Sequence, residues 1–352
     1  MSDTMLQYQA TQKGGPFVLA TVPKPTPDPT DVCIRITAVA LNPLDWKMLS
    51  RGEMIQDWPA TLGLDAAGVV ESVGESVTAF YPGDEVFCLC GIGGKTAGFQ
   101  EIVTVPEHFV AKKPVDRSFE DVAGLPICYL TAAAAILYGL HIPIPHISPT
   151  APGDATPTLR SVLVLGGASA VGSAAIQMLR FALPDATIFA TCSPKHTTRL
   201  QWLGASHWIH RNEPVAHAVK ASVREGVDAI VDCVSAAELD FTIFPALRSD
   251  GPRLYSQVFS GRTVDVPENV ESTVVFGRQV FGAPGGLNAM KALGKLLDED
   301  KYKLPVPTVV IGKGWDAVGA GLQRFKAGVS GQKLVVTIES PELCAQTMTS
   351  QG

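Results

Sequence analysis

Hydrophobic and polar positions follow two different periods along the chain, and the change comes near residue 119. Before it, short runs rich in β-branched residues are separated by Gly and Pro turns, a pattern typical of a compact barrel of strands. The clearest strands are predicted at 31–41, 67–73, 85–89 and 99–105. The glycine-rich stretch 91–98 is expected to be a mobile loop.

From residue 161 onward, apolar strand-like runs alternate with helix-like segments. Strands are predicted at 161–165, 187–191, 206–210, 227–234, 253–259 and within 273–281, and helices at 174–183, 197–203, 216–225 and 237–247. This alternation indicates a parallel, doubly wound sheet. The predicted fold class is therefore α/β, with a six-stranded nucleotide-binding sheet joined to a β-rich barrel domain.

The remaining segments complete the predicted organisation. Stretches rich in Ala and Leu predict helices at 119–125 and 130–140, and the Pro-rich stretch 141–159 is predicted to be an exposed loop. After residue 285 the expected elements are a helix, a strand, a helix and a strand, at 287–298, 306–311, 316–326 and 333–338. Six strands already complete the nucleotide sheet, so we expect domains at 1–126 and 127–284, with 285–352 returning to the first.

The stretch Ser161–Arg180 predicts a strand, a glycine turn and an amphipathic helix. A helix N-terminus presents N–H groups and a positive dipole end to a phosphate, and small residues let the backbone approach it closely. The turn reads Gly-x-Ser-x-x-Gly, so the middle glycine of the full fingerprint is missing. An ordinary strand-to-helix turn is the alternative, and the alternation in the next hundred residues favours a pyrophosphate cradle. Its expected residues are Gly166, Gly167, Ala168, Ser169, Ala170, Val171 and Gly172.

The segment after the second strand of the sheet indicates the type of nucleotide. An NAD site places Asp or Glu about twenty residues after the turn, to bind the ribose 2′-hydroxyl. Here Thr191–His196 contains no acid but has Ser193, Lys195 and His196. A hydroxyl and a cation suit a 2′-phosphate, to which Arg199 and Arg211 are candidates to add hydrogen bonds. We therefore expect NADPH; solvated helix-start residues, with Ser193 as the N-cap, are the alternative.

Composition narrows the class of protein further. The 352 residues are 46% hydrophobic and 18% charged, with a net charge of −6, which suits a globular protein and argues against a nucleic-acid partner. We recognise no signal peptide and no apolar run long enough to span a bilayer, so a cytoplasmic protein without a membrane partner is expected. The seven scattered cysteines suggest reduced, buried thiols and no zinc lobe.

Several stretches, taken in their order and spacing, resemble the medium-chain dehydrogenase/reductase superfamily over essentially the whole chain. They are Leu41–Asp45, Leu62–Val70, Pro82–Val86, Leu125-Pro126 with Leu130–Ala132, the glycine turn, and Gly328–Val336. Within the superfamily, the chain looks like the zinc-independent quinone oxidoreductase and enoyl reductase branch. Its glycine turn, Cys-Ser-Pro-Lys-His stretch and Pro-rich insertion are similar to the trans-acting enoyl reductases of fungal polyketide synthases. The resemblance implies a GroES-like barrel domain and a Rossmann domain.

Zinc alcohol dehydrogenases of this superfamily place a Cys ligand near the first motif and a Gly-His-Glu in the second. Here Asn42-Pro43 replaces the former and Gly63-Leu64-Asp65 the latter, and a leucine cannot bind metal. Without zinc to polarise an alkoxide, alcohol oxidation is disfavoured. The expected reaction is hydride transfer from NADPH to the β-carbon of an enoyl thioester or enone, followed by protonation of the α-carbon.

The resemblance also implies which residues lie near the nicotinamide. Asn42, Pro43, Lys47 and Thr131 are expected to face it, with Lys47 and Thr131 as the catalytic candidates. Lys47 would hold the ribose or steady the enolate, and Thr131 would bind the ribose or carboxamide. The alternatives are a surface lysine on a short helix and a threonine that caps a local carbonyl.

Two further segments resemble parts of related proteins that close over the nicotinamide. The stretch His210-Arg211, by contrast, departs from the pattern of those relatives. The closing segments supply Val280, Phe281, Gly282, Ser330 and Lys333 as candidate cofactor-binding residues. Many relatives carry Asp-Tyr where this chain has His210-Arg211, so the expected contact of Arg211 with the 2′-phosphate departs from their pattern.

The sequence is compatible with more than one substrate and more than one partner. The leading expectation is an enoyl intermediate presented by the carrier domain of a polyketide synthase, bound by a basic patch for which Arg248, Arg253, Arg262 and Arg278 are candidates. The alternatives are a free-standing reductase of quinones or enones, and a family member with non-redox chemistry. A monomer and a homodimer are both compatible with the resemblance. No proton donor is recognised; Tyr129 lies beside the cofactor motif, but packing is the favoured role.

Overall fold

The computed structural model describes residues 3–148 and 159–338, and these divide into two compact units. Of the described residues, unit 1 holds 3–127, 293–298 and 307–338, and unit 2 holds 128–148, 159–292 and 299–306. Part of the predicted Pro-rich loop at 141–159 lies outside the described residues, and so does the whole of Cys344.

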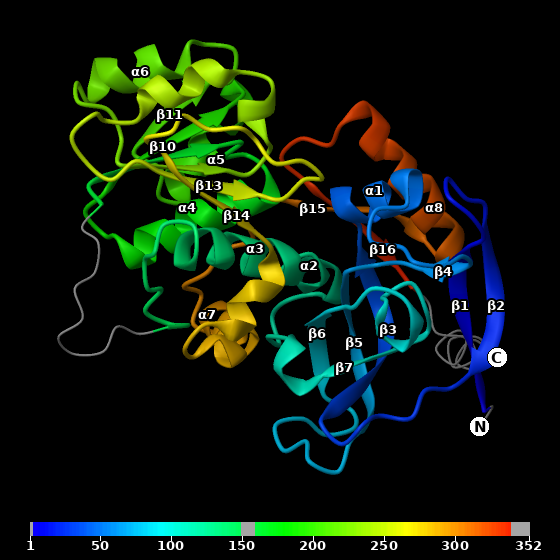
Figure 1. Ribbon diagram of the computed structural model, residues 1–352. Coiled ribbons are helices and arrows are strands. Elements are labelled where there is room, and N and C mark those ends of the chain that lie inside the picture. Colours follow the sequence, from blue (N-terminus) through cyan, green and yellow to red (C-terminus); the bar gives the residue numbers. More distant parts are fainter. Residues whose placement is uncertain (1–2, 149–158, 339–352) are drawn as a thin grey trace. The chain divides into compact units, whose positions relative to one another are not determined.

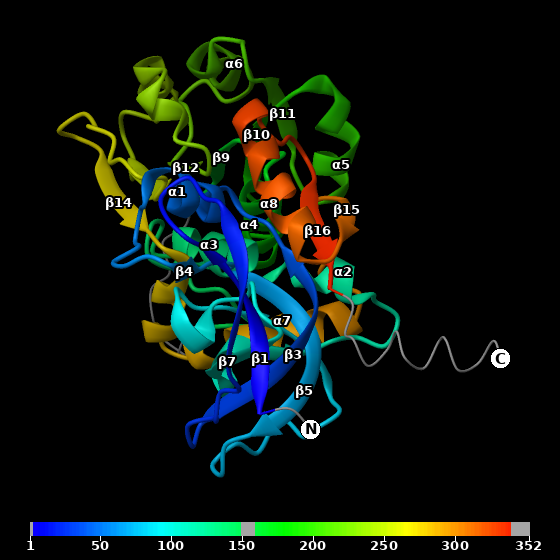
Figure 2. The ribbon, with the colours of Figure 1, turned by 90° about the vertical axis from the view of Figure 1, so that its right-hand side faces the viewer.

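Unit 1 is built on a seven-stranded sheet, in which six strands follow the order β15-β16-β3-β5-β6-β8 and β7 pairs with β3. A separate three-stranded sheet has the order β2-β1-β4, and β1 and β2 run side by side in Figure 1. Figure 2 shows β3 and β5 as long curved neighbours. The strands are β1 (Thr4–Ala10), β2 (Phe17–Pro23), β3 (Asp31–Ala40), β4 (Ala60–Thr61), β5 (Asp65–Val73), β6 (Glu85–Leu89), β7 (Ile102–Pro106), β8 (Val110–Lys112), β15 (Thr308–Lys313) and β16 (Lys333–Thr337).

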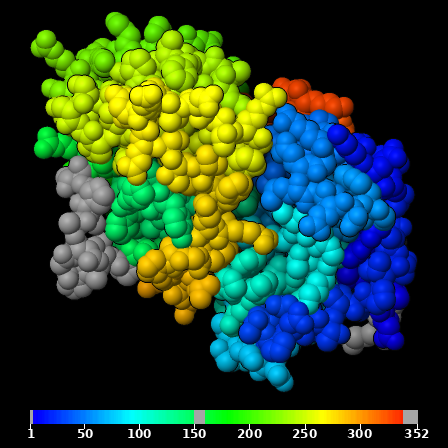
Figure 3. All heavy atoms as spheres, viewed as in Figure 1, coloured from blue at the N-terminus to red at the C-terminus, as the bar shows by residue number. Residues whose placement is uncertain are grey.

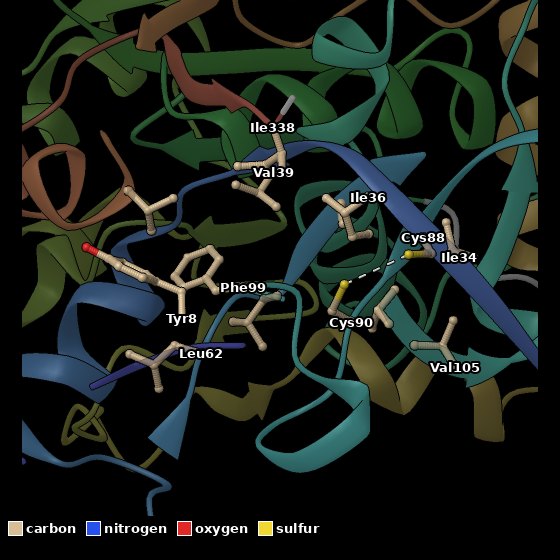
Figure 4. Packing of buried hydrophobic residues seen from close by; sticks show 14 of the residues in the cluster. Tyr8, Ile34, Ile36, Val39, Leu62, Cys88, Cys90, Phe99, Val105 and Ile338 are labelled. Carbon is tan, nitrogen blue, oxygen red and sulfur yellow. Dashed lines mark hydrogen bonds between the residues drawn. The ribbon is translucent and has the colours of Figure 1, made fainter. Parts of the chain in front are cut away.

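The core of unit 1 is apolar and includes two thiols. Ile34 and Ile36 of β3 point inward with Phe99 and Leu62, and each of these side chains is at most 2% exposed (Figure 4). The sulfur atoms of Cys88 and Cys90 face each other at 3.8 Å in the same core. Among the described residues, the six cysteines are free thiols.

Three α-helices accompany these sheets. Helix α1 (Pro43–Arg51) follows β3, helix α2 (Phe119–Ala123) follows β8, and helix α8 (Trp315–Gln323) follows β15. Helix α1 starts at a proline, which needs no N–H partner at that position. It ends at Gly52, whose left-handed φ of 74° suits glycine.

Unit 2 contains a six-stranded sheet with the order β11-β10-β9-β12-β13-β14, in which all neighbours are parallel. The strands are β9 (Ser161–Leu165), β10 (Thr187–Cys192), β11 (His207–His210), β12 (Ala229–Asp232), β13 (Leu254–Val258) and β14 (Glu271–Val275). Because β10 and β11 lie on one side of β9 while β12 lies on the other, the carboxyl end of β9 is the switch point at which such sheets bind ligands. The predicted α/β fold with a doubly wound parallel sheet is confirmed.

Helices connect the strands of unit 2. The α-helices are α3 (Pro126–Leu137, from Cys128 onward in unit 2), α4 (Ala170–Ala182), α5 (Thr197–Trp202), α6 (Val215–Ser222) and the start of α7 (Ala289–Asp298). Short 3₁₀ helices are η3 (Pro194–His196), η4 (Ala236–Glu238), η5 (Phe241–Ala246), η6 (Gly277–Gly282) and η7 (Gly286–Asn288). Strand β14 lies at the edge of the sheet, and the region around it, yellow in Figure 3, forms exposed surface.

Three predicted elements differ from the structure. The helix expected at 237–247 is replaced by η4 and η5, because Asp240 caps a new turn at Thr242 and Pro245 interrupts α-helical hydrogen bonding. The helix expected to start at residue 174 starts at Ala170. The sixth strand ends at Val275, and the remainder of the predicted 273–281 segment contains η6.

The expectation that no apolar run is long enough to span a membrane was wrong, because one stretch of the described chain has the required length and composition. Among the described residues, the stretch Phe119–Leu137 is long and apolar enough, with a mean hydropathy of 1.4. Of its most apolar window, 78% is buried inside the protein, as in the core helix of a globular fold.

Candidate functional site

The glycine turn after β9 is fastened to the end of β10 by a single residue. The N–H of Gly166 donates to Thr191 Oγ1 at 2.8 Å, and the N–H of Gly167 donates to the Thr191 carbonyl at 2.9 Å. These two N–H groups are therefore engaged inside the protein. A ligand at this turn must be bound by the next residues of the chain.

Those residues form the start of helix α4. Ser169 is the N-cap, and its hydroxyl accepts from Gly172 N at 3.0 Å. The hydroxyl keeps its own proton to donate outward. The N–H groups of Ala170 and Val171 lie in the first turn, where helix geometry gives them no intrahelical partner. The serine in place of the middle glycine thus organises the helix start.

The glycines of the turn are required by close backbone contacts. Gly166 has a φ of +71°, a conformation that other residues adopt rarely. A Cβ at Gly172 would lie 2.3 Å from the Gly166 carbonyl oxygen, and one at Gly167 would lie 2.8 Å from Ala190 Cβ. The helix start therefore packs directly on the turn. This cradle, at the switch point of the sheet, fits a pyrophosphate group.

The residues expected to read the 2′-phosphate come together at the carboxyl ends of β10 and β11. Ser193 is the N-cap of η3, which contains Lys195 and His196. Arg211 joins them because its N–H donates to the Cys192 carbonyl at 3.1 Å. Lys195 and Arg211 are exposed. Burial, together with the charges of Lys195 and Arg199, lowers the pKa of His196 and favours the neutral imidazole.

Arg199 does not belong to this group. Its guanidinium donates to the carbonyls of Leu304 and Pro305, the latter at 3.0 Å, and lies 5.9 Å from the centre of the Trp202 ring. It anchors the segment 299–306 within unit 2. The suggestion that Arg199 adds a hydrogen bond to the phosphate is therefore replaced by a structural role.

Thr131 is buried in α3 beside the 3₁₀ helix η6. A Cβ on Gly277, the first residue of η6, would lie 2.9 Å from Thr131 Oγ1. The Tyr138 hydroxyl donates to the Gln279 carbonyl at 2.9 Å and ties the two helices again. The structure thus brings Thr131 next to the segment that contains Val280, Phe281 and Gly282.

Tyr129 has the features of a packing residue. Its side chain is fully buried, and its ring meets that of Tyr302 edge to face at 5.6 Å. Burial raises the pKa of its hydroxyl. A raised pKa makes this phenol a weak proton donor, in agreement with the favoured role.

The four arginines considered for a docking patch differ in their surroundings. Arg248 forms ion pairs with Asp228 at 3.1 Å and Asp250 at 3.0 Å, so its charge is largely compensated. Arg253 donates to the Arg248 carbonyl at 3.1 Å. Arg262 and Arg278 are exposed.

In unit 1, three polar side chains form a closed, buried network. Lys333 Nζ donates to Asn42 Oδ1 at 2.6 Å and to Asp65 Oδ2 at 2.9 Å. Asn42 Nδ2 donates to the same Asp65 oxygen at 3.0 Å. All three residues are at most 7% exposed. Asn42 and Lys333 were expected near the nicotinamide, whereas Asp65 was not recognised as a site residue.

Asp45 extends this network from the first turn of α1. Its Oδ2 accepts from Asn42 N at 2.8 Å, while its buried Oδ1 has no hydrogen-bond partner among the described residues. Burial raises the pKa of this carboxyl to about 7, with the nearby Asp65 carboxylate adding to the rise. A proton on Asp45 leaves the Asp65–Lys333 pair as the charges of this network.

The other expected residues of unit 1 surround these groups. Pro43 is exposed at the first position of α1, and Lys47 is half-buried one turn later. Ser330 is exposed in the segment before β16. Within residues 3–148 and 159–338, no group of three or more His, Cys, Asp or Glu side chains is arranged to hold a metal ion.

Comparisons with known proteins give three consistent similarities. Residues 28–115 match the alcohol dehydrogenase GroES-like domain. The chain is 30% identical to the trans-enoyl reductase himH of Aspergillus japonicus, over 89% of this chain and 91% of that protein. It is also 30% identical to lovC of Aspergillus terreus, the enoyl reductase component of lovastatin nonaketide synthase, over 88% of this chain and 90% of lovC. The predicted family resemblance is confirmed.

A solved structure supports the fold independently. An alcohol dehydrogenase superfamily protein from Novosphingobium aromaticivorans superposes with a TM-score of 0.79, covering 96% of this chain and 100% of that protein. The two sequences are 24% identical, so this likeness concerns the fold. Membership of this family, shown by the matching domain and the 30% identical relatives, implies a nicotinamide cofactor.

The contact between Gly172 and Gly166 generates a first prediction. Gly172→Ala places a methyl group against the Gly166 carbonyl and must move the helix start away from the turn. We expect the Kd for the reduced nicotinamide coenzyme, measured by fluorescence titration, to rise at least about tenfold, or 1.4 kcal/mol. Gly294→Ala is the control, because its Cβ would come no closer than 3.3 Å to another atom. Equal affinities for Gly172→Ala and the unaltered protein would contradict the cradle.

The buried Asp45 generates a second prediction. Its pKa of about 7 in the folded protein exceeds the ordinary value of 3.8, so the folded state holds this proton more tightly than the unfolded state. This group therefore lowers the free energy of unfolding progressively as the pH rises from about 4 to 7, by on the order of 4 kcal/mol in full. Asp45→Asn should remove this loss, so its stability relative to the unaltered protein should increase over that range and level off above it.

Urea denaturation at several pH values from 4.5 to 8 checks this. Asp116→Asn, at a side chain that is 75% exposed, is the control. A stability difference for Asp45→Asn that does not vary with pH would show that Asp45 is ionised throughout.

Proposed function

Because the chain belongs to the medium-chain dehydrogenase/reductase superfamily, we propose that it is an NADPH-dependent, zinc-independent reductase of carbon–carbon double bonds conjugated to a carbonyl. The observation that carries the proposal is the network of Asn42, Asp65 and Lys333. Asn42 and Asp65 of this network lie in the motifs in which zinc-dependent relatives carry metal ligands, and Leu64 replaces the histidine of that pattern. A cation in a hydrogen-bonded network offers no ligand set for zinc.

The proposed cofactor is held by unit 2. The N–H groups of Ala170 and Val171 and the hydroxyl of Ser169 would donate to the pyrophosphate. Ser193, Lys195 and Arg211 would bind the 2′-phosphate, and the absence of an acid in Thr191–His196 avoids repulsion. When bound, NADPH supplies the hydride that adds to the β-carbon of the substrate.

The residues of this chain would then stabilise and orient the substrate. Lys47 Nζ would donate a hydrogen bond to the carbonyl oxygen on which negative charge develops, and the Thr131 hydroxyl would orient the nicotinamide end. Delocalisation over the conjugated carbonyl spreads that charge, so a metal ion is not required for this chemistry. Water would deliver the proton to the α-carbon.

The proposed substrate is an enoyl thioester carried by a polyketide synthase. The support is the 30% identity over most of the chain to himH and lovC, whose names state a trans-enoyl reductase and the enoyl reductase component of a nonaketide synthase. A synthase carrier domain would therefore be the partner. The thioester carbonyl supplies the conjugation that the reaction needs.

The proposal is tested by following NADPH absorbance with an enoyl-pantetheine thioester such as the crotonyl derivative. We expect consumption of NADPH that depends on the thioester and that is unchanged by a metal chelator. Activity with quinones but none with enoyl thioesters would instead identify a free-standing quinone reductase. Tight NADPH binding without turnover of either substrate class would point to non-redox chemistry.

The preference for NADPH generates a further prediction. Lys195→Ala removes an exposed cation of η3, so the KM for NADPH should rise about tenfold, while the KM for NADH should stay within about twofold. Lys220→Ala in α6 is the matched control, because it removes an exposed lysine outside the site. Equal losses with the two coenzymes would show that Lys195 does not read the phosphate.

A further inference from the structure

We infer that Asp65 is a positioning residue that fixes the starts of three elements bearing candidate residues for the nicotinamide end; the inference rests on the proposed function. Asp65 is the first residue of β5 and is fully buried. Both of its oxygens are engaged, and the groups that they bind come from three separate parts of the chain. Its role differs from that of Lys47 or Thr131, because it acts through other residues.

The first element is helix α3. Asp65 Oδ1 accepts from the N–H of Ile127, the second residue of α3, at 2.8 Å. First-turn N–H groups have no partner within their helix, and a carboxylate there also complements the helix dipole. Pro126 has no N–H at the first position, so Ile127 is the first donor that needs a partner. Asp65 thereby fixes the start of the helix that carries Thr131 one turn later.

The second element is strand β16. Lys333 opens this strand, and its ammonium group lies between Asp65 Oδ2 and Asn42 Oδ1. The stem of Lys333 passes so close to Gly124 that a Cβ there would lie 2.5 Å from Lys333 Cγ. The lysine is thus held along its length as well as at its charge. Because Lys333 is buried, its ammonium needs the Asp65 carboxylate as a counter-charge.

The third element is helix α1. Asn42 is its N-cap residue, and Lys47 lies on its first two turns. Asn42 Nδ2 donates to Asp65, while Asn42 Oδ1 accepts from Lys333. This pairing leaves a single orientation of the amide that satisfies both of its ends. A rotation of Asp65 would therefore disturb the ends of α1, α3 and β16 together.

The main test is the variant Asp65→Asn, compared with the unaltered protein. The asparagine side chain has nearly the same size, but one carboxylate oxygen becomes an NH₂ group. This NH₂ group cannot accept the hydrogen bonds that the Asp65 oxygens accept from Asn42, Ile127 and Lys333. We expect kcat for enoyl thioester reduction to fall between about tenfold and a hundredfold, while the Kd for NADPH stays within about threefold. Amide hydrogen exchange, which needs no activity, should speed up at residues 42–47 and 126–131.

Two further variants keep the test decisive. Lys333→Met removes the counter-charge and should give the same fall in kcat and the same faster exchange at residues 42–47 and 126–131, even if Asp65→Asn fails to fold. Lys113→Met is the matched control: its side chain is 5% exposed and paired with Glu85 at 2.9 Å, outside the network. Lys113→Met should leave kcat and the exchange of residues 42–47 and 126–131 unchanged.

The outcomes separate this inference from the proposed function. Unchanged kcat and unchanged exchange in folded Asp65→Asn and Lys333→Met would overturn the positioning role. Equal losses of kcat in Lys333→Met and Lys113→Met would also overturn it, since any buried ion pair would then suffice. An unaltered protein that reduces no enoyl substrate would overturn the proposed function, while faster exchange at both segments in the variants would still support the positioning role.

Discussion

A buried carboxylate must have both its charge and its lone pairs satisfied, and in unit 1 this requirement is met at Asp65 by groups from three distant segments. The hydrogen bonds span sequence separations of 62 and 268 residues at Ile127 and Lys333. Helix starts that would otherwise present unpaired N–H groups are thereby tied to a strand of the sheet. Asp45 lacks such partners at one of its oxygens, and burial, with a smaller contribution from the Asp65 carboxylate, raises its pKa to about 7.

Unit 2 satisfies its own helix starts by shorter-range means. Ser169 caps α4, and Thr191 engages the turn before it, so the cradle is held by residues within one strand–turn–helix and the next strand. Gly172 contributes by lacking a side chain, which lets the helix contact the turn. With the N–H groups of Gly166 and Gly167 engaged, the first turn of α4 offers backbone donors to a ligand.

The doubly wound sheet could be predicted because its strands are short, nearly continuous apolar runs between clear helical segments. Apolar content did not determine structure everywhere. The segment 237–247 has helix-like composition, but Pro245 and the cap at Asp240 divide it into 3₁₀ turns. Strand β2 was missed because exposed apolar side chains, such as Val18 and Leu19 at 44% and 50%, blur its alternation.

The candidate site was predictable to the extent that it depends on local sequence. The glycine turn and the acid-free stretch after β10 could be identified from spacing, whereas Asp65 and Asp45 could not. Their signal in sequence is only an acid inside an apolar motif, and their partners are brought together by the fold. Arg199 was assigned wrongly for the same reason. Its position in the sequence suggested a phosphate contact, but the fold brings the carbonyls of Leu304 and Pro305 to its guanidinium.

Thr191 gives coenzyme recognition a modular character. It holds the pyrophosphate turn through its own hydroxyl and carbonyl, and the loop that would read the ribose phosphate begins only at Ser193. An exchange of residues 193–196 therefore leaves the anchor of the cradle in place. Under the proposed function, the residues that would read the 2′-phosphate, Ser193, Lys195 and Arg211, can therefore vary without loss of the two hydrogen bonds that Thr191 makes to the turn.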